Sequence, residues 1–331
     1  MQICKKCNMP DTRPGSVFEE GVCLACRNYE NRQHIDFEER EALLAKICKE
    51  RIAEGDEYDC VCAVSGGKDS TYIVATLTGL GMKPLLVTVA DEFTKTQAGK
   101  HNLNNLSERF HLDHLLVRFS PKEFRENTLR DFEKELNPLK WIEEKLYEAP
   151  FSIAKKFKIP LVFFGENSGY EYGSDNALSL THPLSDAETT VYYFFAFQAY
   201  NEIEVMKKSK ELGFKDLDYF GEWYRQGNIE NFTQIDSMGY IAHIWTKFPK
   251  FGFQRVSDMT SRMVRKGLLT KELADLLIRE RDYVLDPFAK RDFCSTIGIT
   301  ESYFDKIVDL HANRSILVKD ANGCWRRNDL I

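Results

Sequence analysis

The sequence has no apolar run that approaches the ~20 residues needed to span a bilayer. Its first residues, MQICKKCNMPDTRPG, also lack the apolar core and the small-residue cleavage site of a signal peptide. Basic charge is scarce too: the net charge is −6 and the isoelectric point is near 5.8, whereas nucleic-acid binders usually carry a basic face. These absences predict a cytoplasmic protein without a membrane partner, and they argue against nucleic acid as a partner.

What the sequence does contain is ordinary for a globular enzyme, with 43% hydrophobic and 29% charged residues. Its 331 residues exceed the size at which a single core usually stops growing, so we expect two or three domains. Nine cysteines in a cytoplasmic chain indicate metal ligands or reduced thiols rather than disulfides.

The first four cysteines form two C-x2-C pairs separated by 15 residues, the spacing of a zinc ribbon. A closed site with four thiolates has no open position for a substrate, so we expect a structural Zn2+. An iron–sulfur cluster is the alternative, because thiolates also suit it. The predicted domain covers residues 1–35, and its ligands are Cys4, Cys7, Cys23 and Cys26.

Beyond residue 35, the sequence pattern changes twice, so three further parts are expected. A helix-period pattern over 36–54, with Asp36 as N-cap, predicts a helix within a linking segment, 36–58. Apolar runs that alternate with helical stretches then predict an α/β domain over 59–200, an open and mainly parallel sheet with helices on both faces. Residues 201–331 are expected to form a mainly helical part. The predicted strands are 60–64, 84–89, 114–119 and 160–164, and the predicted helices between them are 70–80, 96–110 and 122–158.

A phosphate-binding loop, SGGKDS, follows the first predicted strand. Glycines let backbone N–H groups approach an anion, and the start of the following helix adds a positive dipole end. Lysine supplies a cation, and the aspartate after it suits Mg2+. The loop is shorter than the G-x-x-x-x-G-K-[ST] loop of kinase-type enzymes. Its residues are Ser65, Gly66, Gly67, Lys68, Asp69 and Ser70.

This string resembles the loop of the N-type ATP pyrophosphatase (PP-loop) superfamily, whose fold is adenine nucleotide alpha hydrolase-like. The resemblance implies that ATP and Mg2+ bind here and that the loop holds pyrophosphate as the leaving group. An acceptor oxygen then attacks the α-phosphorus, and a nitrogen or sulfur nucleophile displaces AMP.

Three further stretches resemble the N-acetyl sugar amidotransferases of bacterial surface polysaccharides, which act on O-antigen sugars and on pseudaminic or legionaminic acids. They are CKKCNMPDTRPG with FEEGVCLACRNYE, then FFGENSGYEYG, then FPKFGFQRVSDMTSR. The likeness is looser between about 175 and 235 and beyond 285. It implies that an N-acetyl group, on a nucleotide-linked or free sugar, is adenylated and then converted to an acetamidine by ammonia.

The resemblance also assigns roles to single residues. Lys68, Asp69 and Glu166 are expected to be catalytic. Asp91 and Gly165 are expected near the nucleotide, although Asp91 suits a surface carboxylate equally well. Expected to bind the substrate are Asn167, Glu171, Tyr172, Lys250 and Arg255. For two of these a structural role is the alternative: a helix N-cap for Asn167, and a salt bridge from Arg255 to Asp258.

The source of ammonia and the reaction class leave alternatives open. Nothing in the sequence fits the nucleophile elbow of a glutaminase, so a separate glutaminase subunit or free ammonia is expected. A tRNA-thiolating enzyme is the alternative, because some members combine a cysteine ribbon with this loop. Such enzymes need further cysteines near the loop, and Cys60 and Cys62 are expected to be core residues instead.

Overall fold

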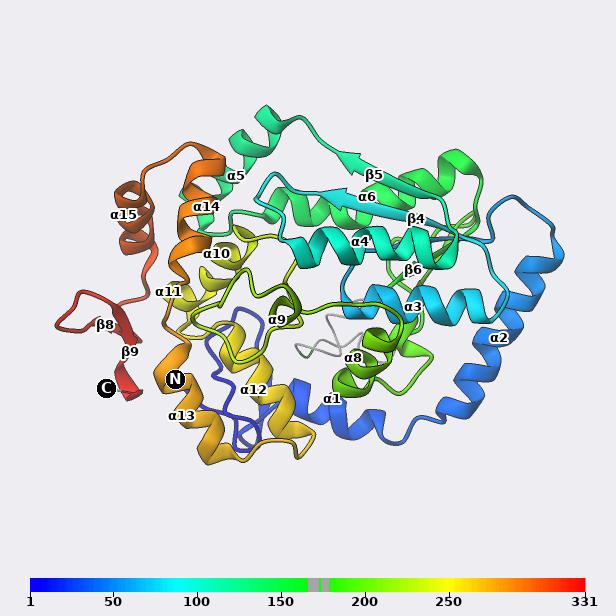
Figure 1. The fold of residues 1–331 in the computed structure, drawn as a ribbon. Helices are drawn as coiled ribbons and strands as arrows, with labels where there is room; N and C mark the ends of the chain where they lie inside the picture. Colours follow the sequence, from blue (N-terminus) through cyan, green and yellow to red (C-terminus); the bar gives the residue numbers. More distant parts are fainter. Residues whose placement is uncertain (166–172, 174–178, 331) are drawn as a thin grey trace.

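The centre of the protein is a five-stranded parallel sheet of order β5-β4-β3-β6-β7. The structure is a computed structural model that describes residues 1–165, 173 and 179–330. The chain runs from β3 outward through β4 and β5, and then returns to the other side of β3 with β6 (Figure 1). The strands are β3 (Cys60–Ala63), β4 (Pro84–Ala90), β5 (His114–Arg118), β6 (Leu161–Phe164) and β7 (Thr190–Tyr193).

The predicted fold class is confirmed, and the four predicted strands are all present. The strand β7 was not predicted, because residues 190–197 read as one aromatic run without alternation. It pairs with β6 from Leu161↔Thr190 to Phe164↔Tyr193. The aromatic residues after it, Phe194, Phe195 and Phe197, are buried, as expected for a run that serves the core.

Alternate residues of the strands face two different cores, as the pleat of a strand requires. Cys60 and Cys62 lie in a core with helices α2 (Phe37–Ala53) and α3 (Lys68–Gly79), whereas Val61 lies in a core with α6 (Lys140–Phe157) on the opposite face. The expectation that both cysteines are core residues is therefore confirmed. Helix α4 (Gln97–Phe110) covers the same face as α3.

The single helix expected over 122–158 is wrong, since two helices replace it: α5 (Pro121–Glu135) and α6. Leu136 ends α5 in the left-handed conformation (φ 48°). Pro138 has no backbone N–H, so it cannot make the hydrogen bond that a continuous helix would require there. The break lets α5 leave the sheet. Phe124 and Phe132 pack with residues of the C-terminal helices, such as Phe293 and Phe304.

The C-terminal part is mainly helical, as predicted, and it ends in a short antiparallel hairpin. Its helices and strands are α8 (Glu202–Glu211), α9 (Leu217–Phe220), α10 (Tyr240–Trp245), α11 (Lys247–Phe251), α12 (Arg255–Arg265), α13 (Lys271–Arg281), α14 (Pro287–Ile297), α15 (Glu301–His311), β8 (Leu317–Lys319) and β9 (Trp325–Arg327). Single helical turns of 3-10 type cover Phe194–Ala196 and Asn328–Leu330.

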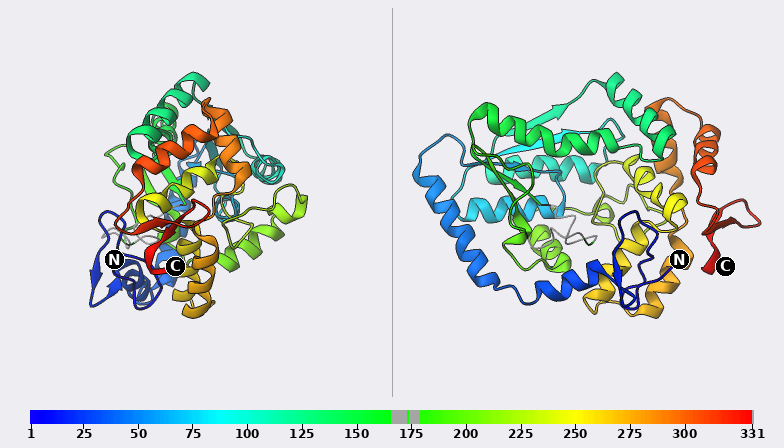
Figure 2. Two further views of the ribbon diagram at one scale, coloured as in Figure 1. Left: turned by 90° about the vertical axis from the view of Figure 1, so that its left-hand side faces the viewer. Right: turned by 180° about the vertical axis from the view of Figure 1, so that it is seen from behind.

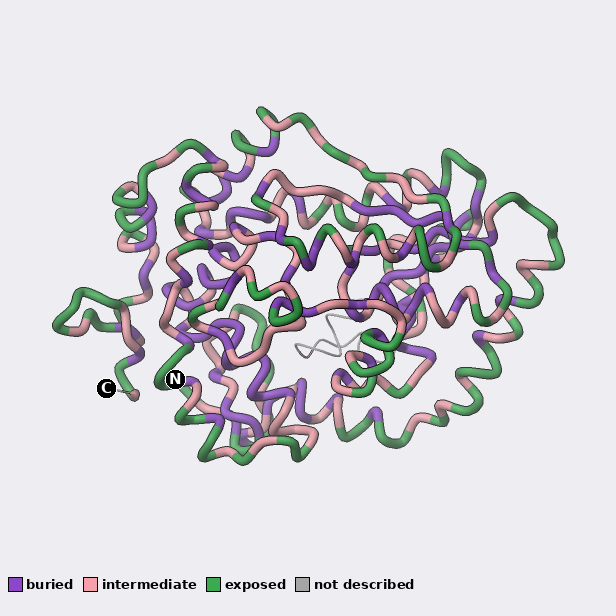
Figure 3. Tube along the Cα trace, in the orientation of Figure 1, coloured by how far each residue is buried: buried purple, intermediate pink, exposed green. Residues whose placement is uncertain are grey.

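The N-terminal segment folds as a small ribbon followed by two helices. It contains β1 (Phe18–Glu19), β2 (Val22–Cys23) and α1 (Leu24–Arg32), and Asp36 then caps α2 by accepting a hydrogen bond from Glu39 N. The ribbon lies beside α12 and α13 in both views of Figure 2. A hydrogen bond joins the two parts, in which Asn8 Nδ2 donates to Lys271 O at 2.9 Å. Much of α2 and of the C-terminal hairpin is exposed, whereas the central strands are buried (Figure 3). None of the helices in the described ranges is both long and apolar enough to cross a bilayer.

Candidate functional site: a phosphate loop facing a buried polar helix

The loop after β3 lies where an open α/β sheet binds ligands. The order of the strands along the chain reverses its direction between β3 and β6. In open α/β sheets, ligands bind at such a point, beyond the carboxyl ends of the strands. Gly66 adopts φ +83°, and a Cβ there would lie 3.0 Å from Leu103 N of α4. Glycine is therefore required both by the backbone conformation and by the packing.

The helix after the loop starts at Lys68, two residues before the predicted start. Gly67 occupies the N-cap position, so the first N–H groups of α3 have no acceptor within the helix and can bind an anion. The Ser70 hydroxyl closes the loop by accepting a hydrogen bond from Ser65 N at 3.0 Å. The predicted loop residues thus form one compact turn.

The two charged residues of the loop contact each other and a tyrosine from outside it. Lys68 Nζ lies 2.6 Å from Asp69 Oδ2 and donates to Tyr200 OH at 3.0 Å, and Tyr200 OH in turn donates to Asp69 Oδ1 at 3.0 Å. Lys68 is buried, whereas the Asp69 side chain is 40% exposed. A bound phosphate would compete for the ammonium, while the exposed carboxylate can reach a Mg2+.

A buried carboxylate, Glu202, connects this loop to α12. Its Oε1 lies 3.9 Å from Lys68 Nζ and 3.8 Å from Arg262 Nη1. Burial by itself raises the pKa of Glu202, but Lys68, Arg262, Arg255 and Lys266 outweigh that effect, so the pKa is lowered and the side chain is a carboxylate. Among the described residues, Lys68 and Arg262 are the two cations within 4 Å of this carboxylate, and Asp69 offsets the charge of Lys68 on the loop side.

Sequence reasoning missed Tyr200, Glu202 and Arg262. Asn201 caps α8 by accepting from Ile203 N and Glu204 N, and this N-cap pattern could have placed Glu202 at a helix start. Arg262 is the last residue of the stretch FPKFGFQRVSDMTSR. Nothing in the sequence alone shows that these residues meet Lys68, because the contact joins segments more than 130 positions apart.

Asp91 is neither exposed nor free. Its Oδ1 accepts from Phe93 N, and its Oδ2 accepts from Lys95 Nζ at 2.7 Å and from Ser237 Oγ at 3.1 Å. The side chain is 13% exposed, so the surface alternative is wrong. These bonds tie the segment after β4 to the C-terminal part, and a role near the nucleotide stays a prediction.

Gly165 lies at the end of β6, where a Cβ would come 2.8 Å from Ile73 Cδ1 of α3. A larger residue here would require the Ile73 side chain to shift. The expected roles of Glu166, Asn167, Glu171 and Tyr172 concern positions outside the described residues.

The two cations expected to bind substrate have other contacts. Lys250 Nζ lies 3.5 Å from Glu135 O, and burial together with Lys247 lowers the pKa of Lys250 to about 8. Arg255 Nη2 donates to Thr233 Oγ1 at 2.6 Å. Asp258, the alternative partner of Arg255, accepts from Lys247 Nζ at 2.6 Å. Arg255 also lies 3.9 Å from Glu230 Oε1, and it contributes to the lowered pKa of Glu202.

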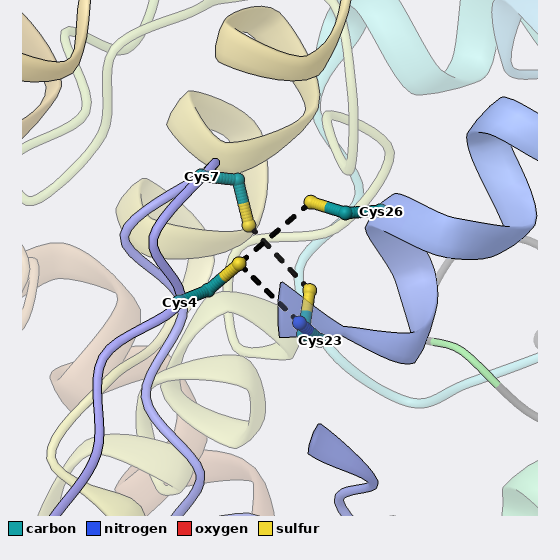
Figure 4. Close-up of side chains that lie close together, drawn as sticks. All are labelled: Cys4, Cys7, Cys23 and Cys26. Atoms are coloured by element: carbon teal, nitrogen blue, oxygen red, sulfur yellow. Dashed lines mark hydrogen bonds between the residues drawn. The ribbon is translucent and has the colours of Figure 1, made fainter. Parts of the chain in front are cut away.

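The four N-terminal cysteines converge as predicted (Figure 4), and all four are buried. Their Sγ atoms lie within 4.8 Å of one another, with Cys7–Cys23 at 3.6 Å and Cys4–Cys26 at 3.9 Å. A tetrahedral ion bound at 2.3 Å separates its sulfur ligands by about 3.8 Å. The residues therefore fit one four-coordinate metal ion.

The surroundings of the cysteines also favour thiolates. Arg265 Nη1 donates to Cys7 Sγ at 3.6 Å, and the backbone N–H groups of Lys6 and Cys23 donate to Cys4 Sγ at 3.4 Å. Ser261 of α12 donates to Cys7 O at 2.7 Å, so the metal site and α12 form one packed unit.

Three solved structures match the chain at low identity and low TM-score. They are NMN synthetase from Francisella tularensis (13% identity, TM-score 0.41, 76% of this chain and 99% of that one), NH3-dependent NAD synthetase from Campylobacter jejuni with a nitrate ion (12%, 0.38, 80% and 98%) and NAD+ synthetase from Burkholderia pseudomallei (11%, 0.35, 78% and 98%). No curated protein is a recognisable relative of the chain by sequence.

The C-terminal part matches a known family. Residues 226–329 fit the family model described as "LPS biosynthesis protein WbpG-like, C-terminal domain", and they include α12 with Arg262. The match bears out the family resemblance for this part of the chain: residues 226–329 are similar to the C-terminal domain of the WbpG-like LPS biosynthesis proteins.

Proposed function

We propose that the protein is an ATP-dependent, AMP-forming amidotransferase that converts the acetamido group of a bacterial surface sugar into an acetamidino group. The observation that carries the proposal is the SGGKDS turn at the point where the strand order reverses, with Lys68 and Asp69 in the first turn of α3. The match of residues 226–329 to LPS biosynthesis proteins supports a sugar of the cell surface as the substrate.

The chemistry proceeds in two balanced steps. The acetamide oxygen attacks the α-phosphorus of ATP, the bond to the β-phosphate breaks, and an O-adenylyl imidate and pyrophosphate result. Ammonia then attacks the imidate carbon, AMP leaves with the original oxygen, and an acetamidine remains after a proton is lost. Lys68 and the N–H groups of the loop neutralise the departing pyrophosphate, and Asp69 would hold a Mg2+, which would supply further positive charge.

Ammonia in this proposal comes from a separate glutaminase subunit or from solution. Five cysteines lie outside the ribbon, and four of them, Cys48, Cys60, Cys62 and Cys294, are buried. Burial raises the pKa of each of these four thiols, which is the reverse of what a nucleophilic cysteine needs. The same burial argues against thiolation of tRNA, because Cys60 and Cys62 offer no reactive sulfur near the loop.

The four-cysteine site is proposed to hold a structural Zn2+. When bound, the ion cross-links the two ends of the ribbon. The chain's own contribution is the set of N–H and guanidinium donors around Cys4 and Cys7, which stabilise negative sulfur. We assign no step of the reaction to this ion.

Turnover of ATP tests the function directly. The purified protein is incubated with ATP, Mg2+, ammonium and a panel of nucleotide-linked acetamido sugars. We expect AMP, pyrophosphate and a sugar product in which NH replaces one oxygen, identified by mass spectrometry. Glutamine alone should not support the reaction.

Two lysine variants, one in the phosphate loop and one outside it, provide the test and its control. Lys68→Ala should lower AMP formation by about a hundredfold or more, because the charge that stabilises pyrophosphate is lost. Lys100→Ala, on the exposed face of α4, should react like the wild type. Equal turnover by Lys68→Ala and the wild type would contradict the proposal.

A further inference from the structure

Lys266 is a half-buried lysine beside the phosphate loop, at the C-cap position of α12. Its Nζ lies 5.1 Å from the centroid of the Tyr200 ring, and Lys68 Nζ lies 5.6 Å from the same centroid. The hydroxyl of that tyrosine also accepts from Lys68 Nζ and donates to Asp69. The two ammonium groups therefore lie against one aromatic ring at the edge of the phosphate loop.

An aromatic ring is a weak partner for this ammonium. A cation–π contact at an exposed site contributes about 0.5–1 kcal/mol, and among the described residues Lys266 has no hydrogen bond and no ion pair. Two other half-buried lysines have carboxylates: Lys95 Nζ lies 2.7 Å from Asp91, and Lys247 Nζ lies 2.6 Å from Asp258. Partly buried charges are normally paired, so the counter-ion of Lys266 is expected to arrive with a ligand.

The charges around Lys266 also favour the arrival of an anion. Burial lowers the pKa of Lys266, and the neighbouring cations Arg262 and Lys68 lower it further. Glu202 raises this pKa, but its Oε1 already lies within 4 Å of both of those cations. Asp69 is likewise in contact with Lys68. An anion that contacts Lys266 would reduce the repulsion among the three cations.

The phosphate loop supplies the kind of anion. The first N–H groups of α3 and the Lys68 ammonium suit a phosphate group. A pyrophosphate unit carries more than one negative charge even with Mg2+ bound, so a second cation stabilises it further. Lysine is a flexible point charge whose ammonium can turn from a ring to a phosphate oxygen, where the hydrogen bond is charge-assisted and stronger.

We propose that Lys266 is a second phosphate-binding lysine, which contacts the β- and γ-phosphates of ATP together with Lys68 and holds the pyrophosphate as it departs. The proposal rests on the proposed function in one respect, that ATP is the nucleotide. Lys266 lies within residues 226–329, which match the LPS biosynthesis family model. The site for the phosphates is then complete only where the α/β domain and the C-terminal part meet.

Calorimetric titrations with pyrophosphate, ATP and AMP, all in the presence of Mg2+, test this contact. Lys266→Gln should weaken the binding of pyrophosphate and of ATP about tenfold, because one charge-assisted contact is lost. The affinity for AMP should not change, because AMP lacks the β- and γ-phosphates. Lys266→Arg, which keeps the charge, should recover a large part of the pyrophosphate affinity.

A lysine on a neighbouring helix provides the matched control. Lys207→Gln removes the same charge from an exposed position on α8 and should leave all three affinities unchanged. The melting temperatures of the ligand-free variants should equal that of the wild type, which excludes a folding defect as the cause. The proposal is overturned if Lys266→Gln binds pyrophosphate as the wild type does, or if it loses all three ligands equally.

Acetylation of the wild type is a second measurement, and it requires no variant. The protein is treated with acetic anhydride, with and without Mg2+ and pyrophosphate, and the modified lysines are quantified by mass spectrometry. We expect pyrophosphate to slow the modification of Lys266 severalfold and to leave Lys207 unaffected. Equal modification of Lys266 in both samples would contradict the proposed contact.

The outcomes separate this proposal from the proposed function. Pyrophosphate binding that depends on Lys266, without AMP formation from any acetamido sugar, would remove the amidotransferase reaction and leave the phosphate contact. AMP formation by Lys266→Gln with a wild-type KM for ATP and a wild-type affinity for pyrophosphate would keep the reaction and remove the contact.

Discussion

Glu202 is the residue on which the electrostatics of the site depend. A carboxylate beside an anion-binding loop is unfavourable for the anion, yet here it lies between two cations that would otherwise repel each other. Lys68 and Arg262 both lie within 4 Å of its Oε1. It therefore holds both cations in place before a ligand arrives.

Replacing this carboxylate should leave Lys68 and Arg262 to repel each other without a counter-ion. In Glu202→Gln, buried cations lose their shared counter-ion, and removing one partner of a buried ion pair typically costs about 3–5 kcal/mol. We expect a lower melting temperature, of which pyrophosphate restores a larger part than it adds to the wild type. Thermal melts with and without pyrophosphate measure this. Glu204→Gln, exposed on the same helix, is the control, and an unchanged melting temperature in Glu202→Gln would refute the argument.

At the residue scale, the sequence predicts a site whose residues are adjacent in the chain. It misses contacts between residues that only the fold brings together. Ser65 to Ser70 form their turn within one short segment, so their type and order are enough to predict it. Tyr200 and Glu202 reach Lys68 only because α8 packs against α3. Lys250 contacts the end of α5, and its expected role in substrate binding stays a prediction.

At the scale of elements, α12 is held by the end of α13. Asp282 Oδ2 accepts from Gln254 N at 3.1 Å and from Ser257 Oγ at 2.6 Å, and its Oδ1 accepts from Ser257 N at 3.1 Å. These bonds satisfy N–H groups at the start of a buried helix that solvent cannot reach. Asp282 thus acts as an external cap that positions Asp258 and Arg262.

This cap should make stability depend on pH. Burial raises the pKa of Asp282 from 3.8 to about 6. An acid with a raised pKa in the folded state stabilises the fold while it is protonated, so this stabilisation is complete below pH 3.8 and is lost as the pH rises through about 6. The wild type should therefore lose, relative to Asp282→Asn, on the order of 3 kcal/mol between acid and neutral pH. Urea unfolding of both proteins at a series of pH values measures the difference, and a constant difference would contradict the assignment.

Whether an element could be predicted depended on whether its pattern is local. The four inner strands are continuous apolar runs, which indicate burial on both faces. Strand β7 was hidden inside an aromatic run, and the break between α5 and α6 was hidden by continuous helical periodicity up to Pro138. Helix α12 is the instructive case, because nothing in its polar sequence shows that eight consecutive residues of it are buried.

At the scale of the whole molecule, three layers meet at one place: the sheet with its phosphate loop, the buried helix α12 and the ribbon. The ribbon is fixed to the C-terminal helices by Ser261 Oγ, which donates to Cys7 O, and by Lys271 Nζ, which donates to Lys5 O. Arg265 bridges to Cys7 Sγ. The sheet holds the nucleotide side of the site, and Glu202 joins that side to α12.

Removal of the metal should affect the ribbon more than the nucleotide side. A structural four-thiolate metal supplies much of the folding energy of a small domain, so chelation or Cys26→Ser should unfold the ribbon and remove its contacts with α12. We expect a lower melting temperature, while ATP affinity changes far less because the phosphate loop lies on the sheet. Thermal melts, calorimetry with ATP and metal analysis measure this, and Cys324→Ser, at an exposed cysteine outside the ribbon, should keep the metal and the melting temperature. Loss of ATP binding on removal of the metal would show that the ribbon supports the whole fold.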